Sequence, residues 1–368
     1  MKKTFVTESF LPPLDDYIKK LRMVWKTSQL TNNGPFSLEL CAALKNFLNA
    51  PYLSLVNNGT MALQLAIRAL KLMGGEIITT PFSYVATSSS IVWEQCVPIF
   101  ADIDKETWCI DPKEIEKKIT KKTKAILATH VFGYPCDVEQ IATIARQFNL
   151  KIIYDAAHTF GVKYKSIPLC NYGDVATLSF HATKLFHTAE GGAIVCHDKD
   201  LLAELDLMKK FGHFGEDNYQ MLGTNAKMSE LHAAMGICIL PYFDQIIAAR
   251  KKISEYYDRL LSTVEVVRPV CSSDIDYNYS YYPVLFPTSE IMSYARELMH
   301  EQGIYPRRYF FPSLNTLPYL YADTGKMESC PTSEDITSRV LALPLSHKLE
   351  NPQIEHIAEL IVRAMEQR

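Results

Sequence analysis

One stretch of the chain carries more chemical information than any other: LSFHATK at residues 178–184, followed by EGGAI at residues 190–194. Lys184 comes just after an apolar run, in a turn of small and hydroxyl residues, and two glycines then lead into another apolar run. Burial in such a turn lowers the pKa of a lysine and makes its neutral amine available as a nucleophile toward an aldehyde. Most lysines are solvated surface residues, so this interpretation of Lys184 depends on the rest of the sequence.

Around this stretch the sequence alternates between two hydrophobic periodicities. Helical spacing runs over residues 38–48 and 61–72. Short apolar runs of strand length lie at residues 53–56, 76–79, 97–101, 125–129 and 151–154. The alternation predicts an α/β fold, with a mainly parallel mixed sheet flanked by helices on both faces.

Polar residues follow each of these runs. The carboxyl ends of the strands are where α/β sheets gather their chemistry, so these positions are the candidates for a site. They are residues 57–60, residues 80–84, Asp102, His130, Asp155 and His158.

Asp155 ends a strongly apolar run at residues 152–155. A carboxylate there suits an acid that stays ionised beside a buried cation. A cap on the next helix is an equally good explanation of an isolated aspartate at a strand end.

The sequence VNNGTMAL at residues 56–63 predicts a strand, a turn with glycine and then a helix. Backbone amides at that helix start, together with the Thr60 hydroxyl, form an anion site suited to a phosphate. Many α/β proteins have Gly-Thr at a helix start and bind nothing there, so this motif alone is a weak signal.

Beyond residue 240 the pattern changes. A long helical stretch over residues 242–261 leads into short segments at 268–270 and 281–286 and then a helix at 289–300. We therefore expect a large domain over residues 1–245, which includes the N-terminal segment, and a smaller C-terminal α+β domain over residues 246–368.

The composition excludes several classes of protein. The chain has 368 residues, 48% hydrophobic and 21% charged, which is ordinary for a globular protein without long disordered segments. A formal net charge of −3 with mixed signs indicates neither nucleic-acid nor membrane binding. Nine cysteines without a C-x-x-C pair or zinc spacing predict reduced thiols in a cytoplasm and no metal site. No apolar run approaches the ~20 residues of a membrane span.

Taken in order, these motifs resemble the DegT/DnrJ/EryC1/StrS sugar aminotransferases. The motifs are the phosphate-type turn, the aromatic segment after it, Asp155 with His158 three residues on, the lysine stretch and the two glycines. The resemblance covers nearly the whole chain, from LTNNGP at residues 30–35 to SRVLALPL at residues 338–345. It implies the pyridoxal-phosphate (PLP) dependent transferase fold of type I, which is that of aspartate aminotransferase, and PLP as cofactor.

The resemblance also implies roles for single residues. It makes Lys184 the lysine that forms a Schiff base with PLP, and Asp155 the partner of the pyridine nitrogen. The other cofactor contacts that it implies are phosphate binding by Gly59, Thr60 and Ser179, ring stacking by Tyr84 and a ring-hydroxyl contact by His158.

The resemblance implies a homodimer with shared active sites. Asn225 matches an asparagine that reaches the phosphate from the other subunit, although Ala226 and Lys227 replace the usual aromatic residue and arginine, so the contacts of that pair are in doubt. Asn225 opens an expected helix over residues 226–239, whose apolar positions have helical spacing. Core packing would explain this stripe as well, and only the resemblance places it near a subunit interface.

Arg307, Arg308 and Tyr309 lie where the family contacts nucleotide and sugar. A guanidinium group suits a diphosphate because its planar fork binds two oxygens at once. A pair of adjacent arginines is often only a solvated surface, so both interpretations stand.

The implied reaction transfers an amino group from L-glutamate to a nucleotide-linked keto sugar and leaves 2-oxoglutarate. The lysine stretch is similar to that of members acting at C4, which implies dTDP-4-keto-6-deoxy-D-glucose as substrate and dTDP-4-amino-4,6-dideoxy-D-glucose as product, for surface polysaccharide biosynthesis. Some enzymes acting at C3 share this form, so amination of a dTDP-3-keto-6-deoxyhexose stays open. A sugar dehydratase of the same fold would carry histidine in place of Lys184, and a non-catalytic sensor would be expected to lose Asp155 or Lys184.

Overall fold

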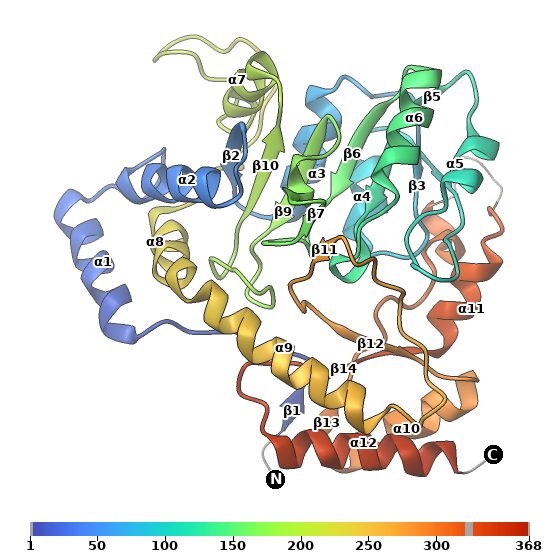
Figure 1. Cartoon of the computed structure of the whole chain (residues 1–368). Helices are drawn as coiled ribbons and strands as arrows, with labels where there is room; N and C mark the ends of the chain where they lie inside the picture. The colour runs from blue at the N-terminus through green and yellow to red at the C-terminus, as the bar shows by residue number, and fades with distance from the viewer. Residues whose placement is uncertain (1–2, 321–326, 367–368) are drawn as a thin grey trace.

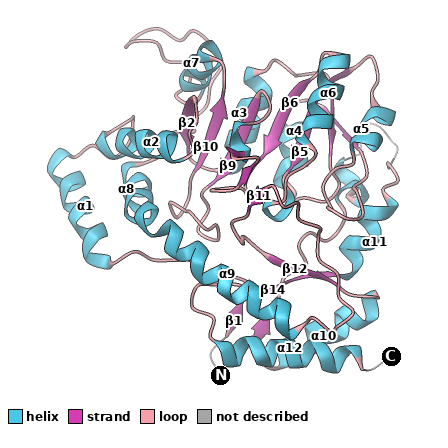
Figure 2. Ribbon diagram, viewed as in Figure 1, coloured by secondary structure: helices cyan, strands magenta, loops and turns pink. Residues whose placement is uncertain are grey.

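The structure is a computed structural model that describes residues 3–320 and 327–366. At its centre a seven-stranded sheet lies between layers of helices (Figures 1 and 2). Strand β10 runs antiparallel to both of its neighbours, and the other pairs are parallel. The strands in spatial order are β2 (Tyr52–Val56), β10 (Gly192–Cys196), β9 (Val175–Ser179), β6 (Lys151–Asp155), β5 (Thr123–Thr129), β3 (Glu76–Thr79) and β4 (Val97–Phe100).

Alternate residues of each strand face opposite layers. In β5, Ala125 and Leu127 belong to one core cluster, whereas Ile126 and Ala128 belong to another on the opposite face. Because both faces are covered, the strands read as nearly continuous apolar runs rather than alternating ones. The expected α/β class, with a mainly parallel mixed sheet, is confirmed.

Helices cover both faces of the sheet. The first face carries α3 (Gly59–Ala69), α4 (Ala86–Trp93) and α7 (Lys199–Met208). The opposite face carries α2 (Pro35–Phe47), α5 (Pro112–Lys118), α6 (Val138–Phe148) and α8 (Glu230–Ile239), with α1 (Leu14–Thr27) packed on α8. Short 3-10 helices are η1 (Val131–Gly133), η2 (Leu169–Asn171), η3 (Leu240–Tyr242), η4 (Leu314–Thr316) and η5 (Pro318–Leu320).

The C-terminal part has an apolar core of its own. It is built on the antiparallel strands β12 (Tyr282–Leu285) and β14 (Val340–Leu343), with helices α9 (Phe243–Leu260), α10 (Ser289–Glu301), α11 (Pro331–Arg339) and α12 (Asn351–Met365). Helix α9 joins the two parts, because Phe243 and Ile246 lie in the core of the large sheet while Ile253 and Tyr257 lie in the C-terminal core (Figure 1). The domain boundary at residues 245/246 stays a prediction.

Two small sheets tie distant segments together. Strand β1 (Thr4–Phe5) pairs in parallel with β13 (Ile304–Tyr305), so the N-terminal segment lies against the C-terminal part. The second small sheet contains, in spatial order, β11 (Ile275–Asp276), β7 (Lys163–Tyr164) and β8 (Ile167–Pro168).

The helix expected over residues 226–239 was wrong at its start. Helix α8 begins at Glu230, because the Ser229 side chain accepts a hydrogen bond from the backbone N–H of His232 and so caps the helix there. Asn225 therefore does not open a helix and instead forms an isolated bridge with Lys210.

One helical run of the described residues, Glu230–Leu260, is long and apolar enough to cross a membrane by length and composition alone. It combines α8, η3 and α9, and Ala233, Ala234 and Ile239 of α8 are buried in the core of the protein. Core helices pass the same test, so this run is weak evidence of a span.

His130 follows β5 and is fully buried. Its ring stacks on Tyr154 with centroids 4.5 Å apart, and Nδ1 accepts a hydrogen bond from the Cys136 N–H at 3.0 Å. Burial lowers the pKa of His130 to about 3, so the native state keeps this ring neutral.

His130 makes the stability of the fold depend on pH. The native state resists protonation that the unfolded chain accepts below pH ~6.5, so stability is intact above that pH and falls as the pH decreases toward 3. From pH 6.5 to 5 this costs about 2 kcal/mol. Chemical denaturation at both pH values should show a smaller loss in His130→Asn than in the parent, and an equal loss in both would contradict this role of His130.

Candidate active site

A cavity of about 910 Å³ opens at the carboxyl edge of the parallel strands. It lies between the large sheet, the C-terminal part and the N-terminal segment, and Phe5, Val6 and Thr7 of that segment form part of its wall. The residues predicted from the sequence that line it are Gly59, Thr60, Tyr84, Asp155, His158, Ser179, Lys184, Arg307 and Tyr309.

The amino end of α3 forms a cradle for an anion in this cavity. The Asn58 side chain caps the helix by accepting from the backbone N–H of Met61 at 2.8 Å. Gly59 and Thr60 are the first two residues of α3, so their backbone N–H groups have no carbonyl of a preceding helical turn to bond and are available to an anion. A Cβ at Gly59 would lie 2.9 Å from the Cβ of Ser179, so only glycine lets the helix approach the Ser179 hydroxyl this closely.

Asp155 ends β6 and is 6% exposed. One carboxylate oxygen accepts from the Thr87 hydroxyl at 2.7 Å, and the other from the Ala157 N–H at 3.1 Å. Burial raises the pKa of Asp155, whereas these two hydrogen bonds and the charge of Lys184 act to lower it. Residues 156–161 form turns rather than a helix, so Asp155 is not a helix cap.

A chain of hydrogen-bonded, buried hydroxyl groups ends at the Asp155 carboxylate. Thr87, on α4, is bonded to Ser83 at 2.7 Å, and Ser83 is bonded to Thr129 at 3.0 Å. Each of the three side chains is 2% exposed or less. The chain of hydroxyls fixes the orientation of the Thr87 donor, because Thr87 is bonded to Asp155 on one side and to Ser83 on the other, and Ser83 is itself bonded to Thr129.

His158 is held as a neutral ring. Its Nδ1 accepts from the backbone N–H of Phe132 at 3.1 Å, so the proton of the neutral ring belongs on Nε2. The ring lies parallel to that of Phe310, with centroids 5.7 Å apart. Burial lowers the pKa of His158 well below its usual value, and the nearby charge of Lys184 lowers it further. His158 is therefore a hydrogen-bond donor without charge.

Lys184 is partly buried in the same cavity. Burial lowers the pKa of its amine, while the charge of Asp155 acts in the opposite direction. The amine donates to the hydroxyl of Tyr281 at 3.5 Å. A Lys184 amine that loses its proton more readily than a solvated lysine suits the nucleophile expected from the sequence.

Two predicted site residues lie outside the cavity of this chain. The Asn225 side chain is exposed and its oxygen accepts from Lys227 Nζ at 2.5 Å. The Arg308 side chain donates to the Ser338 carbonyl at 3.1 Å and stacks on Phe311.

The other two strand-end candidates have structural roles. Asp102 accepts from the backbone N–H groups of Thr332 and Ser333 and so caps the start of α11. His130 is packed beneath the sheet edge, as described above.

The sequence interpretation missed several residues that the structure brings to the site. Thr87 supports Asp155, Tyr281 contacts Lys184, and His300 and Phe310 line the cavity wall. Ser83, which is bonded to Thr87, lies in the polar segment 80–84 that the sequence did single out, and the hydroxyl residues that continue from it were a signal for Thr87. Tyr281 had no distinguishing signal, because Tyr277, Tyr279 and Tyr282 lie in the same segment.

The residues that line the cavity fit PLP. The fit rests on Gly59, where a Cβ would crowd the Ser179 side chain and fill the space at the start of α3, and on the polar groups that line the cavity. The Gly59 and Thr60 amides with Ser179 would hold the phosphate, Asp155 the pyridine nitrogen and Lys184 the aldehyde carbon.

Comparison with known proteins places this site in a family. The model of the DegT/DnrJ/EryC1/StrS aminotransferase family matches residues 14–362. A dTDP-4-amino-4,6-dideoxy-D-glucose transaminase of Shigella dysenteriae is 41% identical over 367 residues, and one of Escherichia coli 37% over 368, each match covering 98% of both chains. The crystal structure of DesI with its TDP-sugar product superposes with a TM-score of 0.94 at 28% identity, over 100% of this chain and 94% of that one.

Thr87→Val keeps the shape of the side chain and removes the hydroxyl that donates to Asp155. We expect the pKa of Asp155 to rise further in this variant, because burial then acts on a carboxylate with one hydrogen bond fewer. Thr177→Val is the matched control, since buried Thr177 donates to the Tyr154 carbonyl instead. A pH titration of the Asp155 carboxyl carbon by NMR, with the signal assigned by its loss in Asp155→Asn, measures the shift. Equal Asp155 pKa values in the two valine variants would remove Thr87 from this role.

Proposed function

The chain belongs to the DegT/DnrJ/EryC1/StrS aminotransferase family, and we propose that it transfers the amino group of L-glutamate to C4 of dTDP-4-keto-6-deoxy-D-glucose. The family makes it a PLP-dependent transaminase. The observation that supports the proposed chemistry is that Lys184 and Asp155 line one cavity, each with its pKa shifted toward the neutral form. A sensor without activity would have no use for this pair.

PLP, when bound, supplies an aldehyde carbon that takes up the amino group and a ring that accepts electrons from the reacting carbon. The start of α3 would hold the phosphate, and buried Asp155 would pair with the ring nitrogen and keep it protonated. Neutral His158 donates from Nε2 without adding a second positive charge to the site.

Lys184 moves the proton in both halves of the reaction. Its amine takes a proton from the α-carbon of glutamate in the first half and delivers one to C4 of the sugar in the second. Burial lowers the pKa of Lys184 and so favours the neutral, proton-accepting amine more than in a solvated lysine. The first product, 2-oxoglutarate, leaves before the keto sugar binds, so ping-pong kinetics follow.

The nucleotide sugar enters beside the C-terminal wall of the cavity. Arg307 lines this wall with its guanidinium 5.4 Å from the centre of the Tyr309 ring, and both residues are our candidates for contact with the substrate. The guanidinium of Arg308 is engaged with carbonyls at the end of α11, so we assign diphosphate binding to Arg307 in preference. We place the enzyme in the cytoplasm, in keeping with nine cysteines that form no disulfide, and its product in surface polysaccharide biosynthesis.

Product analysis tests the substrate and the position of the nitrogen. We expect the purified protein with PLP, L-glutamate and dTDP-4-keto-6-deoxyglucose to give dTDP-4-amino-4,6-dideoxyglucose, with the nitrogen located at C4 by NMR. The basis is the full-length similarity to two transaminases named for that sugar. Lys184→Ala is the control and should give no product. Amination at C3, or amination only of the 3-keto isomer, would replace this proposal by the C3 alternative.

We further propose a homodimer in which each site takes Asn225 from the neighbouring subunit. The backbone carbonyl of Ala226 accepts from the Asn57 N–H at 2.8 Å, which anchors the segment beside the phosphate turn. The Asn225 side chain nevertheless faces solvent and does not line the cavity of its own chain. An exposed amide next to one cradle, directed away from it, suits contact with a second subunit across a two-fold axis.

Complementation between defective subunits tests the shared site. Lys184→Ala and Asn225→Ala are each expected to lose most turnover at limiting PLP. When equal amounts are mixed and the subunits exchange, heterodimers should contain one intact site and one doubly damaged site, which restores roughly a quarter of all sites. Exchange is verified by mass spectrometry of differently tagged subunits. Activity that stays at the mean of the two parents despite exchange would show that Asn225 serves its own chain or none.

A further inference from the structure

Tyr281 is the hydrogen-bond partner of the Lys184 amine among the described residues. The Lys184 Nζ donates to the Tyr281 hydroxyl at 3.5 Å, and Tyr281 lines the same cavity. Burial raises the pKa of Tyr281 to about 12, so the phenol keeps its proton at neutral pH. It therefore meets Lys184 as a neutral group that both accepts and donates hydrogen bonds.

The Tyr281 ring has little freedom to move. It packs edge-on against His158 with centroids 4.9 Å apart and against Tyr309 at 5.6 Å, and it tilts against Phe132 at 5.5 Å. Contacts on several sides hold an aromatic ring in one rotamer. The direction of its hydroxyl toward Lys184 is thus set by the packing.

The backbone before Tyr281 is held by a buried arginine. Arg250 of α9 is 4% exposed, and it donates from Nε to the Tyr279 carbonyl at 2.8 Å and from Nη2 to the Ser280 carbonyl at 2.5 Å. Burial lowers the pKa of Arg250 to about 10, which still leaves it charged at neutral pH. Charge-assisted hydrogen bonds to two successive carbonyls restrain the backbone that carries Tyr281.

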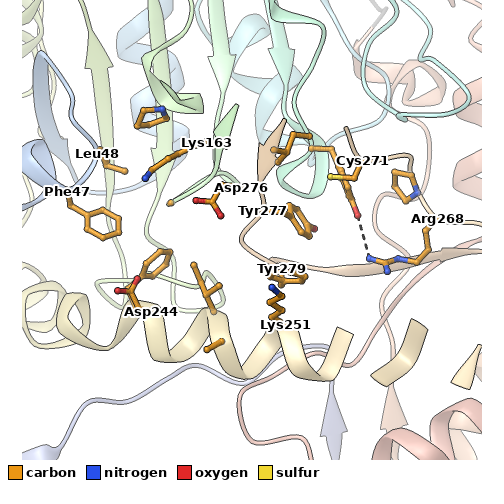
Figure 3. A pocket seen from close by; sticks show the side chains of 18 residues that line it. Phe47, Leu48, Lys163, Asp244, Lys251, Arg268, Cys271, Asp276, Tyr277 and Tyr279 are labelled. Carbon is orange, nitrogen blue, oxygen red and sulfur yellow. Dashed lines mark hydrogen bonds between the residues drawn. The ribbon is translucent and has the colours of Figure 1, made fainter. Parts of the chain in front are cut away.

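The same segment is also tied to the loop that carries His158. The Asn278 amide donates to the carbonyls of His158 and Phe160, both at 2.9 Å, and the Ser280 hydroxyl donates to the His158 carbonyl at 2.9 Å. On the other side of the segment, the Tyr277 and Tyr279 side chains line a second cavity of about 780 Å³, which lies above α9 (Figure 3). Residues 277–281 thus form a wall between two cavities, anchored along its length.

We propose that Tyr281 is a further catalytic residue, which orients the Lys184 amine for proton transfer, and that Arg250 is its positioning residue. This inference rests on the proposed transaminase function. Lys184 Nζ takes the proton from carbon and becomes an ammonium group, one N–H of which donates to Tyr281 Oη. When the ammonium group returns a proton to carbon, the same contact fixes the direction of the amine. Tyr281 itself gains and loses no proton.

Tyr281→Phe removes the hydroxyl and keeps the ring. We expect PLP affinity and the KM for glutamate to change little, turnover to fall about tenfold, and the isotope effect with C2-deuterated glutamate to increase, because proton transfer becomes slower than the other steps. Tyr279→Phe is the matched control, since its ring faces the second cavity and its isotope effect should equal that of the parent. An unchanged isotope effect in Tyr281→Phe would overturn the proposal.

A second readout needs neither cofactor nor sugar. In the PLP-free protein, the pH dependence of Lys184 modification by an amine-reactive reagent, followed by mass spectrometry, reports the pKa of this amine. Loss of the acceptor that stabilises the ammonium form should lower that pKa further in Tyr281→Phe and not in Tyr279→Phe. An identical profile in both would also count against Tyr281. This result stands even if the sugar substrate proves to be another one.

Arg250→Met tests the positioning role. It should reproduce the isotope effect and the Lys184 pH profile of Tyr281→Phe. The double variant that combines Tyr281→Phe with Arg250→Met should give the same isotope effect and the same profile as either single variant, because both changes disturb one contact. Arg250→Lys keeps the charge and should restore part of the parental behaviour. Arg250→Gln replaces Arg250→Met if that variant fails to fold. Parental values in folded Arg250→Met or Arg250→Gln, or additive effects in the double variant, would exclude Arg250 as the positioning residue.

Discussion

The rest of the structure depends on one constraint: the Lys184 amine and the Asp155 carboxylate are both shielded from water at the same cavity. Burial shifts the pKa of Lys184 downward and that of Asp155 upward, and the attraction between them opposes both shifts. The distance between the two groups depends on the register of two neighbouring parallel strands, because Asp155 of β6 pairs with Thr177 of β9 and the turn after β9 carries Lys184. Hydrogen bonds from Lys184 N to the His181 carbonyl and from Thr188 N to the Phe180 carbonyl close the turn that returns Lys184 to the cavity.

Local patterns in the sequence predicted most of the sheet and the centre of the site. The run at residues 125–129 became β5 and the strand-end Asp155 became a buried cavity residue, since periodicity and strand ends are properties of neighbouring residues. The start of α8 was missed because the Ser229 cap outweighs apolar spacing. The placement of Arg307 in the cavity and Arg308 outside it depends on contacts with a distant segment, because Arg307 bridges to Ala342 and Arg308 donates to the Ser338 carbonyl.

The residues that sequence reasoning did not find are those whose role comes from tertiary contact. Thr87 is 68 positions from the carboxylate it supports, and Tyr281 is 97 positions from the amine it contacts. Neither residue type nor spacing distinguishes them from neighbouring threonines and tyrosines. Thr87 donates to the Asp155 carboxylate and Tyr281 accepts from the Lys184 amine, so residues with ordinary local sequence contact both of these ionisable groups.

The pairing of β1 with β13 links the cavity to the order in which the chain is made. Thr4 pairs with Ile304, a separation of 300 positions, and Phe5, Val6 and Thr7 then complete the cavity wall. Since the ribosome synthesises the N-terminal end first, β1 cannot pair with β13 until most of the polypeptide has been made. A nascent chain therefore has most of its central sheet before it has a closed pocket, and capture of the cofactor in its final surroundings is a late event of biogenesis.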